Sequence, residues 1–150
     1  MAIISWGKPT LEIAPLGANG MPETFVALPT PVQDSTQLST EAGSKLEAFV
    51  EGGERIDVRY DKNKFKCEFE LFKTKGAEKP ILDDDGIILS EYALRLTPED
   101  TEQEGWIMNR ASVAVEETWA ANVGHKWKYT FEALKPASGK LLEPYIVEED

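Results

Sequence analysis

The sequence predicts a mainly β protein: an antiparallel β-sandwich or barrel with long hairpins and at most one short helix, in a single β domain over residues 1–150. Two observations lead to this prediction. Apolar and polar residues alternate through much of the chain, which is the two-residue period of half-buried strands. Turn-forming residues separate about nine or ten such runs at intervals of roughly 8–12 residues, the spacing typical of sandwiches and barrels.

The first third of the chain predicts a loose hairpin and an extended connector. Residues 10–14 and 24–28 are its strands, and the PLGANGMP stretch between them is rich in turn formers. Pro29 and Pro31 lack the N–H group that a central strand needs, so the chain is expected to leave the sheet there. Residues 32–40 are polar and rich in Ser and Thr, which indicates an extended connector or an edge strand.

The next part predicts three consecutive strands arranged as a meander. Residues 45–51 and 55–60 both alternate, and Gly52-Gly53 between them predicts a two-residue hairpin turn. After a turn at residues 61–63, residues 64–72 form the clearest strand of the chain. Its apolar parity contains Phe65, Cys67, Phe69 and Leu71. Because Cys67 shares this parity and is the one cysteine, it is predicted to be a buried, inert thiol.

Residues 73–104 are less regular. Residues 73–86 contain Gly, Pro and three consecutive aspartates, which predicts a long loop with one helical turn over 77–82 at most. Residues 87–97 read as a strand that ends before Pro98. The acidic stretch that follows, residues 98–104, has room for a helical turn or two only.

A long hairpin over residues 105–136 organises the rest of the chain. In its second arm, apolar residues from Trp127 to Ala133 alternate with polar ones, which predicts one buried and one wet face. In its first arm the core parity is that of Ile107, Ala111, Val113 and Val115, and Trp106 and Met108 fall on the nominally polar side. That side is expected to meet either the rest of the domain or another copy of the chain. Residues 140–147 predict one more short strand before an acidic end expected to be frayed.

Composition narrows the class of function. The formal net charge is −11, from 27 acidic and 16 basic residues, which argues against a protein that grips nucleic acid through a basic patch. The same charge suits plain solubility, and it also suits a conduit that must not hold DNA. No apolar run approaches the roughly 18 residues of a membrane helix, and no secretory signal is visible at the start, so no contact with a membrane is predicted.

No catalytic, cofactor-binding or metal-binding residue is predicted, and an enzyme is not expected. Asp83, Asp84 and Asp85 are consecutive, so their carboxylates point in different directions, which favours a solvated turn over a calcium site. His125 is the one histidine and has no cysteine partner, which indicates a turn residue rather than a zinc ligand or a member of a triad. Phosphate-cradling glycine loops are absent from the sequence.

Several stretches resemble small tail tube proteins, also called major tail proteins, of long-tailed phages and phage-like elements. They are YALRLTPED at residues 92–100, ASVAVEET at 111–118 and above all KWKYTFEALKPASGK at 126–140, and VEGGERIDVRY at 50–60 and the STQLST segment fit the same pattern. The resemblance touches most of the chain and is carried by strand pattern. In place of the long helix of many tail tube proteins, this chain offers only the short candidates named above.

The resemblance implies a virion structural protein. Its copies would close into rings, commonly of six, and the rings would stack into a tube that conducts DNA. The implied partners are further copies of the chain, other tail proteins, and DNA as a non-specifically conducted cargo. The implied location is the virion tail of a particle made in the bacterial cytoplasm.

Two sets of site residues follow from this hypothesis. The expected subunit-interface residues are Trp106, Met108 and Trp119. The expected lumen charges, which would repel DNA, are Glu68, Glu70, Glu116 and Glu132. The alternative is a β-sandwich binding module that recognises carbohydrate or peptide through exposed aromatic residues such as Trp106 and Trp119. Under either hypothesis, mid-strand parity predicts core positions for Phe69, Trp127 and Phe131.

Overall fold

The computed structural model describes residues 3–147, which form ten strands and no helix. The strands are β1 (Thr10–Pro15), β2 (Val26–Ala27), β3 (Gln37–Glu41), β4 (Lys45–Phe49), β5 (Arg55–Tyr60), β6 (Lys64–Phe72), β7 (Tyr92–Thr97), β8 (Gly105–Ala120), β9 (Gly124–Ala133) and β10 (Glu143–Tyr145). Within the described residues there is accordingly no helix long and apolar enough to cross a bilayer. The predicted acidic end, residues 148–150, lies outside the described part of the chain.

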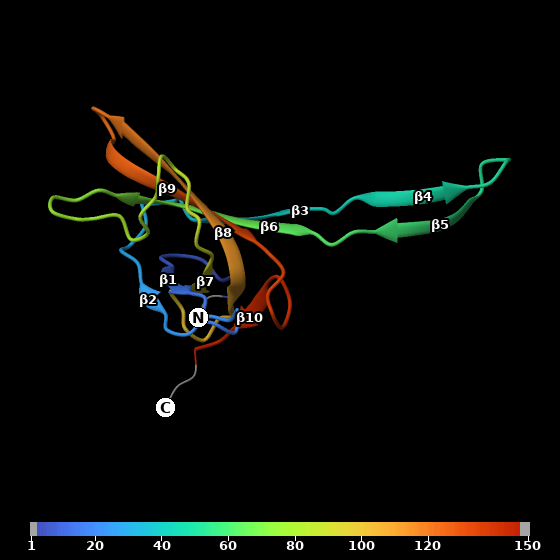
Figure 1. Ribbon diagram of the computed structural model, residues 1–150, viewed down its shortest axis with the longest axis horizontal. Coiled ribbons are helices and arrows are strands. Elements are labelled where there is room, and N and C mark those ends of the chain that lie inside the picture. Colours follow the sequence, from blue (N-terminus) through green and yellow to red (C-terminus); the bar gives the residue numbers. More distant parts are fainter. Residues whose placement is uncertain (1–2, 148–150) are drawn as a thin grey trace.

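Eight strands form one curled sheet, and the other two form a small sheet of their own (Figure 1). The order in the main sheet is β2-β1-β7-β8-β9-β6-β3, with β10 beside β8. Every pairing between strands is antiparallel. The main sheet curls into a half-barrel, so the predicted fold class, a mainly β antiparallel sandwich or barrel, is confirmed.

The predicted long hairpin is present and lies at the centre of the sheet. β8 and β9 pair from Ala111 opposite Ala133 to Ala120 opposite Gly124, and β6 pairs with the other side of β9. The Phe69 ring of β6 stacks on the rings of Tyr129 and Phe131, with centroids 5.9 and 5.7 Å apart. The predicted core residues Phe69, Trp127 and Phe131 are 1, 3 and 0% exposed, and Cys67 is 0% exposed, so these predictions are confirmed.

β8 changes its parity along its length because it contains a β-bulge. Opposite β8, Tyr92 of β7 pairs with Ala111 and Leu94 pairs with Met108, so β8 has one residue more than β7 between these pairs. An extra residue moves the side chains beyond it to the opposite face. Met108 therefore points into the core and is 0% exposed, and Trp106 packs against the same core. The prediction that both lie on a polar, partner-facing side is wrong.

The predicted meander is also wrong, because β5 does not pair with β6. Instead β3 pairs with β6 and β4 pairs with β5, so residues 37–72 run out and back as one very long hairpin. The predicted hairpin near the N-terminus is confirmed by the pairing of β1 with β2, and residues 32–40 do supply an edge strand, β3.

The two candidate helical turns do not form helices. Residues 77–82 and 98–104 adopt turns and bends. The strand predicted over residues 87–97 is shorter than expected, since β7 begins at Tyr92. The segment between β6 and β7, residues 73–91, therefore runs as a long loop, as predicted for its first part.

Candidate assembly surfaces

β4 and β5 form an arm that projects away from the half-barrel (Figure 1). These two strands pair only with each other. Every residue of β4 is exposed, and in β5 only Val58 is partly covered. The large apolar side chains of the arm, each 43–67% exposed, are Leu46, Phe49, Val50, Ile56 and Tyr60. A two-stranded hairpin is marginally stable in water, so an arm with this much apolar surface is suited to contact with a partner.

At the base of the arm, the backbone at Gly43 passes very close to the backbone at Asp61. This point lies between the arm and the strands β3 and β6. A Cβ atom on Gly43 would clash with the carbonyl oxygen of Asp61, so only glycine allows the two segments to approach this closely. The Gly43 N–H donates a hydrogen bond to Asn63 Oδ1 at 3.2 Å, and the Asp61 N–H donates to the Ser44 carbonyl at 2.8 Å. The crossing therefore fixes where the arm leaves the sheet.

The charged residues of the arm add little to its stability. Lys45 and Arg55 both contact the Glu47 carboxylate, at 2.8 and 3.3 Å, and the Lys45 Nζ lies 5.9 Å from the centre of the Tyr60 ring. These pairs are exposed to solvent, where an ion pair contributes about 0–1 kcal/mol. The arm is therefore a hairpin whose strands pair only with each other and whose large apolar side chains are mostly exposed.

The four glutamates predicted as lumen charges share one face of the sheet, the face opposite the core. Across the strands, Glu68 lies opposite Thr130, Glu70 opposite Lys128, and Glu116 also opposite Lys128. Glu132 lies on the same face, between Lys66 of β6 and Ser112 of β8. Alternation correctly predicted that each of the four lies on the polar side of its strand, and strand pairing brings them to one face. Whether they line a lumen stays a prediction.

This polar face carries charges of both signs. Lys66 and Lys128 contact the Glu68 carboxylate at 2.9 and 3.4 Å, and Lys126 contacts Glu70 at 3.0 Å. The hydrogen bond between Lys66 and Glu68 raises the pKa of the lysine and lowers the pKa of the glutamate. The face is a mixed ladder of Lys and Glu rather than the uniformly negative surface that the four glutamates alone suggest.

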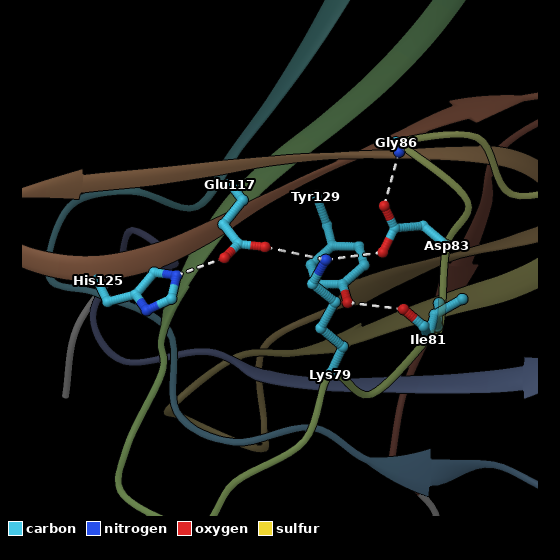
Figure 2. A network of polar contacts seen from close by, with 7 residues as sticks. All are labelled: Lys79, Ile81, Asp83, Gly86, Glu117, His125 and Tyr129. Carbon is cyan, nitrogen blue, oxygen red and sulfur yellow. Dashed lines mark hydrogen bonds and ion pairs between the residues drawn. The ribbon is translucent and has the colours of Figure 1, made fainter.

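The 73–91 loop is fastened to the β8–β9 hairpin by a polar network (Figure 2). Lys79 Nζ lies 2.8 Å from Asp83 Oδ1 and 3.1 Å from Glu117 Oε1. The other Glu117 oxygen, Oε2, lies 2.6 Å from His125 Nε2. The hydrogen bond with His125, and then that with Lys79, lowers the pKa of Glu117. His125 was predicted to be a turn residue, but it lies in β9 and takes part in this network.

A buried contact holds the same loop against the core. Ile81 is 3% exposed and belongs to the core cluster, and the Tyr129 hydroxyl donates a hydrogen bond to its carbonyl oxygen at 3.0 Å. Burial raises the pKa of the Tyr129 hydroxyl. Asp83 is engaged within the loop, because its Oδ2 accepts a 2.6 Å hydrogen bond from the Gly86 N–H. Hydrogen bonds from Lys79 and Gly86 lower the pKa of Asp83.

The two tryptophans predicted to form a partner surface do not lie together. Trp119 is 70% exposed beside the β8–β9 turn, whereas Trp106 is half-buried near the other end of β8. A strand rises by about 3.3 Å per residue, so the two side chains are separated by roughly 40 Å along β8. Trp119 therefore stays a candidate interface residue, and Met108 does not, since it has no exposed surface.

Comparisons with known proteins do not identify a function for this chain. The sequence matches no protein-family model, and the search of curated proteins finds no match. The family resemblance of the sequence accordingly stays a prediction. The sequence predicted the hairpin of the arm and its turn at Gly52-Gly53, which the pairing of β4 with β5 confirms, but not that this hairpin stands apart from the main sheet.

Proposed function

We propose that this chain is the structural subunit of a tube, as the tail tube proteins that it resembles are, and that its copies assemble into stacked rings whose channel conducts DNA. The observation that carries the proposal is the arm. Five large apolar side chains are 43–67% exposed on a hairpin that packs against no other strand of its own chain. Contact with neighbouring copies would bury this surface.

The length of the arm supports contact between neighbours. Gly52 at the tip lies eleven positions after Glu41, the end of β3, so the arm reaches about 35 Å at roughly 3.3 Å per residue. A compact body of about 130 residues has a radius of gyration of roughly 14 Å, hence a diameter of about 36 Å. The arm is therefore long enough to cross a neighbouring copy.

The edges of the main sheet support ring closure. β3 is an edge strand, and the opposite edge, β2, has two residues only. An uncovered edge strand can add to the sheet of another chain through main-chain hydrogen bonds. If copies join in this way, the polar face would supply a wet wall on which Lys and Glu neutralise one another, and such a wall has little affinity for phosphate.

The proposal is tested by removing the arm. Glu41 and Lys64 are direct partners across β3 and β6, so residues 42–63 can be replaced by Asn-Gly, which forms a tight turn between paired strands. We expect the shortened chain to keep its β-sheet circular dichroism and to stay monomeric by light scattering. The full chain should form rings or tubes, visible in electron micrographs. A full chain that is monomeric up to millimolar concentration would contradict the proposal.

The binding-module alternative has weaker support. It requires exposed aromatic residues on one surface, but Trp106 is half-buried and far from Trp119. The other exposed aromatic side chains are Trp6 near the N-terminus, Phe49 and Tyr60 on the arm, and Phe72 at the end of β6. They lie on different elements from Trp119, whereas carbohydrate or peptide recognition needs several contacts that converge. We therefore favour self-assembly.

A further inference from the structure

Exposed large apolar side chains gather at two opposite ends of the molecule. Of the sixteen in the described part of the chain, five lie on the arm. Five more lie in the 73–91 loop or beside the β8–β9 turn; this surface, the loop end, consists of Leu82, Ile87, Leu89, Trp119 and Val123. Phe72, at the end of β6, lies on the polar face of the sheet with Glu70 and is not part of it. Figure 1 shows the arm at one end of the longest axis, and the 73–91 loop and the β8–β9 turn at the other.

The loop end is held in place before any partner binds. Ile81 is anchored in the core, and its neighbour Leu82 is 77% exposed. The contacts of Lys79 with Asp83 and Glu117 fix the loop on both sides of these residues (Figure 2). A surface that needs no ordering when it binds loses less conformational entropy, so these outward side chains form a ready contact surface.

Charge favours the arm as the part of one copy that approaches another. Residues 43–62 contain four basic and five acidic residues, a net charge of −1, so the remaining 130 residues carry −10. The half-barrels of two copies, each with a charge of about −10, repel each other. The arm, with a charge of −1, approaches the half-barrel of another copy with little electrostatic repulsion. At the tip of the arm, Glu51 and Glu54 are exposed. The 73–91 loop exposes Lys73 and Lys75 at its start and Glu78, Asp84 and Asp85 further along, so the stretch that complements the acidic tip is the one that contains Lys73 and Lys75.

We infer that the arm of one copy docks on the loop end of the next copy. This inference rests on the proposed function and names the surface that accepts the arm. A contact between two different surfaces is heterologous, and its repetition leads to rings or filaments, whereas arm-to-arm contact would close a two-fold dimer. The apolar side chains of the arm pack against those of the loop end, and Glu51 and Glu54 approach Lys73 and Lys75.

Disulfide cross-linking between two single-site variants tests the contact. The chain has one native cysteine, Cys67, which is fully buried, and burial raises its pKa to about 12, so it does not react under mild oxidation. Glu51→Cys protein is mixed with Lys75→Cys protein and oxidised under conditions in which the wild-type chain assembles. We expect a covalent dimer that contains one copy of each variant. The matched control replaces Lys75→Cys by Lys140→Cys, at an exposed position in a different loop, and should give at least tenfold less of this dimer.

The outcomes separate the inference from the proposed function. If the wild-type chain does not assemble by light scattering, the proposed function fails and the inference fails with it. If the chain assembles but Glu51→Cys cross-links only to itself or equally to Lys140→Cys, self-assembly stands and the docking surface is wrong. As a second measurement, Trp119→Ser should raise the concentration needed for half-maximal assembly about tenfold, equivalent to roughly 1.4 kcal/mol. An unchanged concentration would contradict a role for the loop end.

Discussion

The aromatic stack of Phe69, Tyr129 and Phe131 is the centre of the core, and its stability can be tested at a single residue. Phe131 is 0% exposed, and its ring centroid lies 5.7 Å from that of Phe69. We expect Phe131→Ala to lower the free energy of unfolding by about 3–5 kcal/mol, because it removes a large ring and leaves a cavity. Chemical denaturation measures this loss.

Phe49→Ala is the matched control for Phe131→Ala. The Phe49 side chain is 58% exposed on the arm, so its removal leaves no cavity, and we expect a change within about 0.5 kcal/mol. The same variant should weaken assembly, because Phe49 belongs to the surface proposed to be buried between copies. Equal losses of stability in the two variants would contradict the difference in burial.

Glu117 gives a prediction about pH. Its pKa is lowered in the folded chain, so its contribution to stability is fully present above its ordinary value of 4.5 and is lost as the pH falls through the lower folded-state pKa. We expect Glu117→Gln to lower the urea midpoint at pH 6 and to have a smaller effect at pH 3. Glu116→Gln is the control, because Glu116 faces the other side of the sheet. A loss of stability that is the same at both pH values would contradict this linkage.

At the scale of elements, alternation predicts each strand well where pairing is regular. β6 and β9 keep one register throughout, and their core residues were identified correctly. β8 contains a bulge, and no signal in its own sequence marks the extra residue, because the bulge depends on how β7 pairs with it. The hairpin of the arm was predicted from alternation and from Gly52-Gly53, and the pairing of β4 with β5 confirms it. Alternation does not show which strand lies on the other side of residues 55–60, so their predicted pairing with residues 64–72 was wrong.

Gly43 provides a test of the arm as an element. Its backbone crosses that of Asp61 too closely for a Cβ atom, so we expect Gly43→Ala to shift the base of the arm without affecting the distant core. Stability of the half-barrel should change by less than about 1 kcal/mol, while assembly should weaken strongly. Ser44→Ala, one residue further along the exposed strand connection, is the control and should assemble normally. Normal assembly of Gly43→Ala would show that the direction of the arm does not matter.

At the scale of the whole molecule, the net charge of −11 opposes assembly. Raising the ionic strength from about 20 mM to about 150 mM shortens the screening length from roughly 20 Å to about 8 Å, which weakens repulsion between bodies. The few exposed ion pairs expected between arm and loop end are worth about 1 kcal/mol or less each, so loss of repulsion should dominate. Light scattering should therefore show assembly at lower protein concentration in the higher salt. The armless chain should stay monomeric in both.

The position of the arm at one end of the molecule and the loop end at the other has a consequence for growth. If copies join through this contact, a head-to-tail series that has not closed into a ring presents a free arm at one extremity and a free loop end at the other. Its two extremities are then chemically different, and the series has a polarity. A copy without an arm retains its loop end. Such a copy would bind the free arm at one extremity of a growing series but would offer no arm to the next copy. It would therefore stop growth at that extremity only. The average length of the assemblies would then depend on the fraction of armless copies in the mixture.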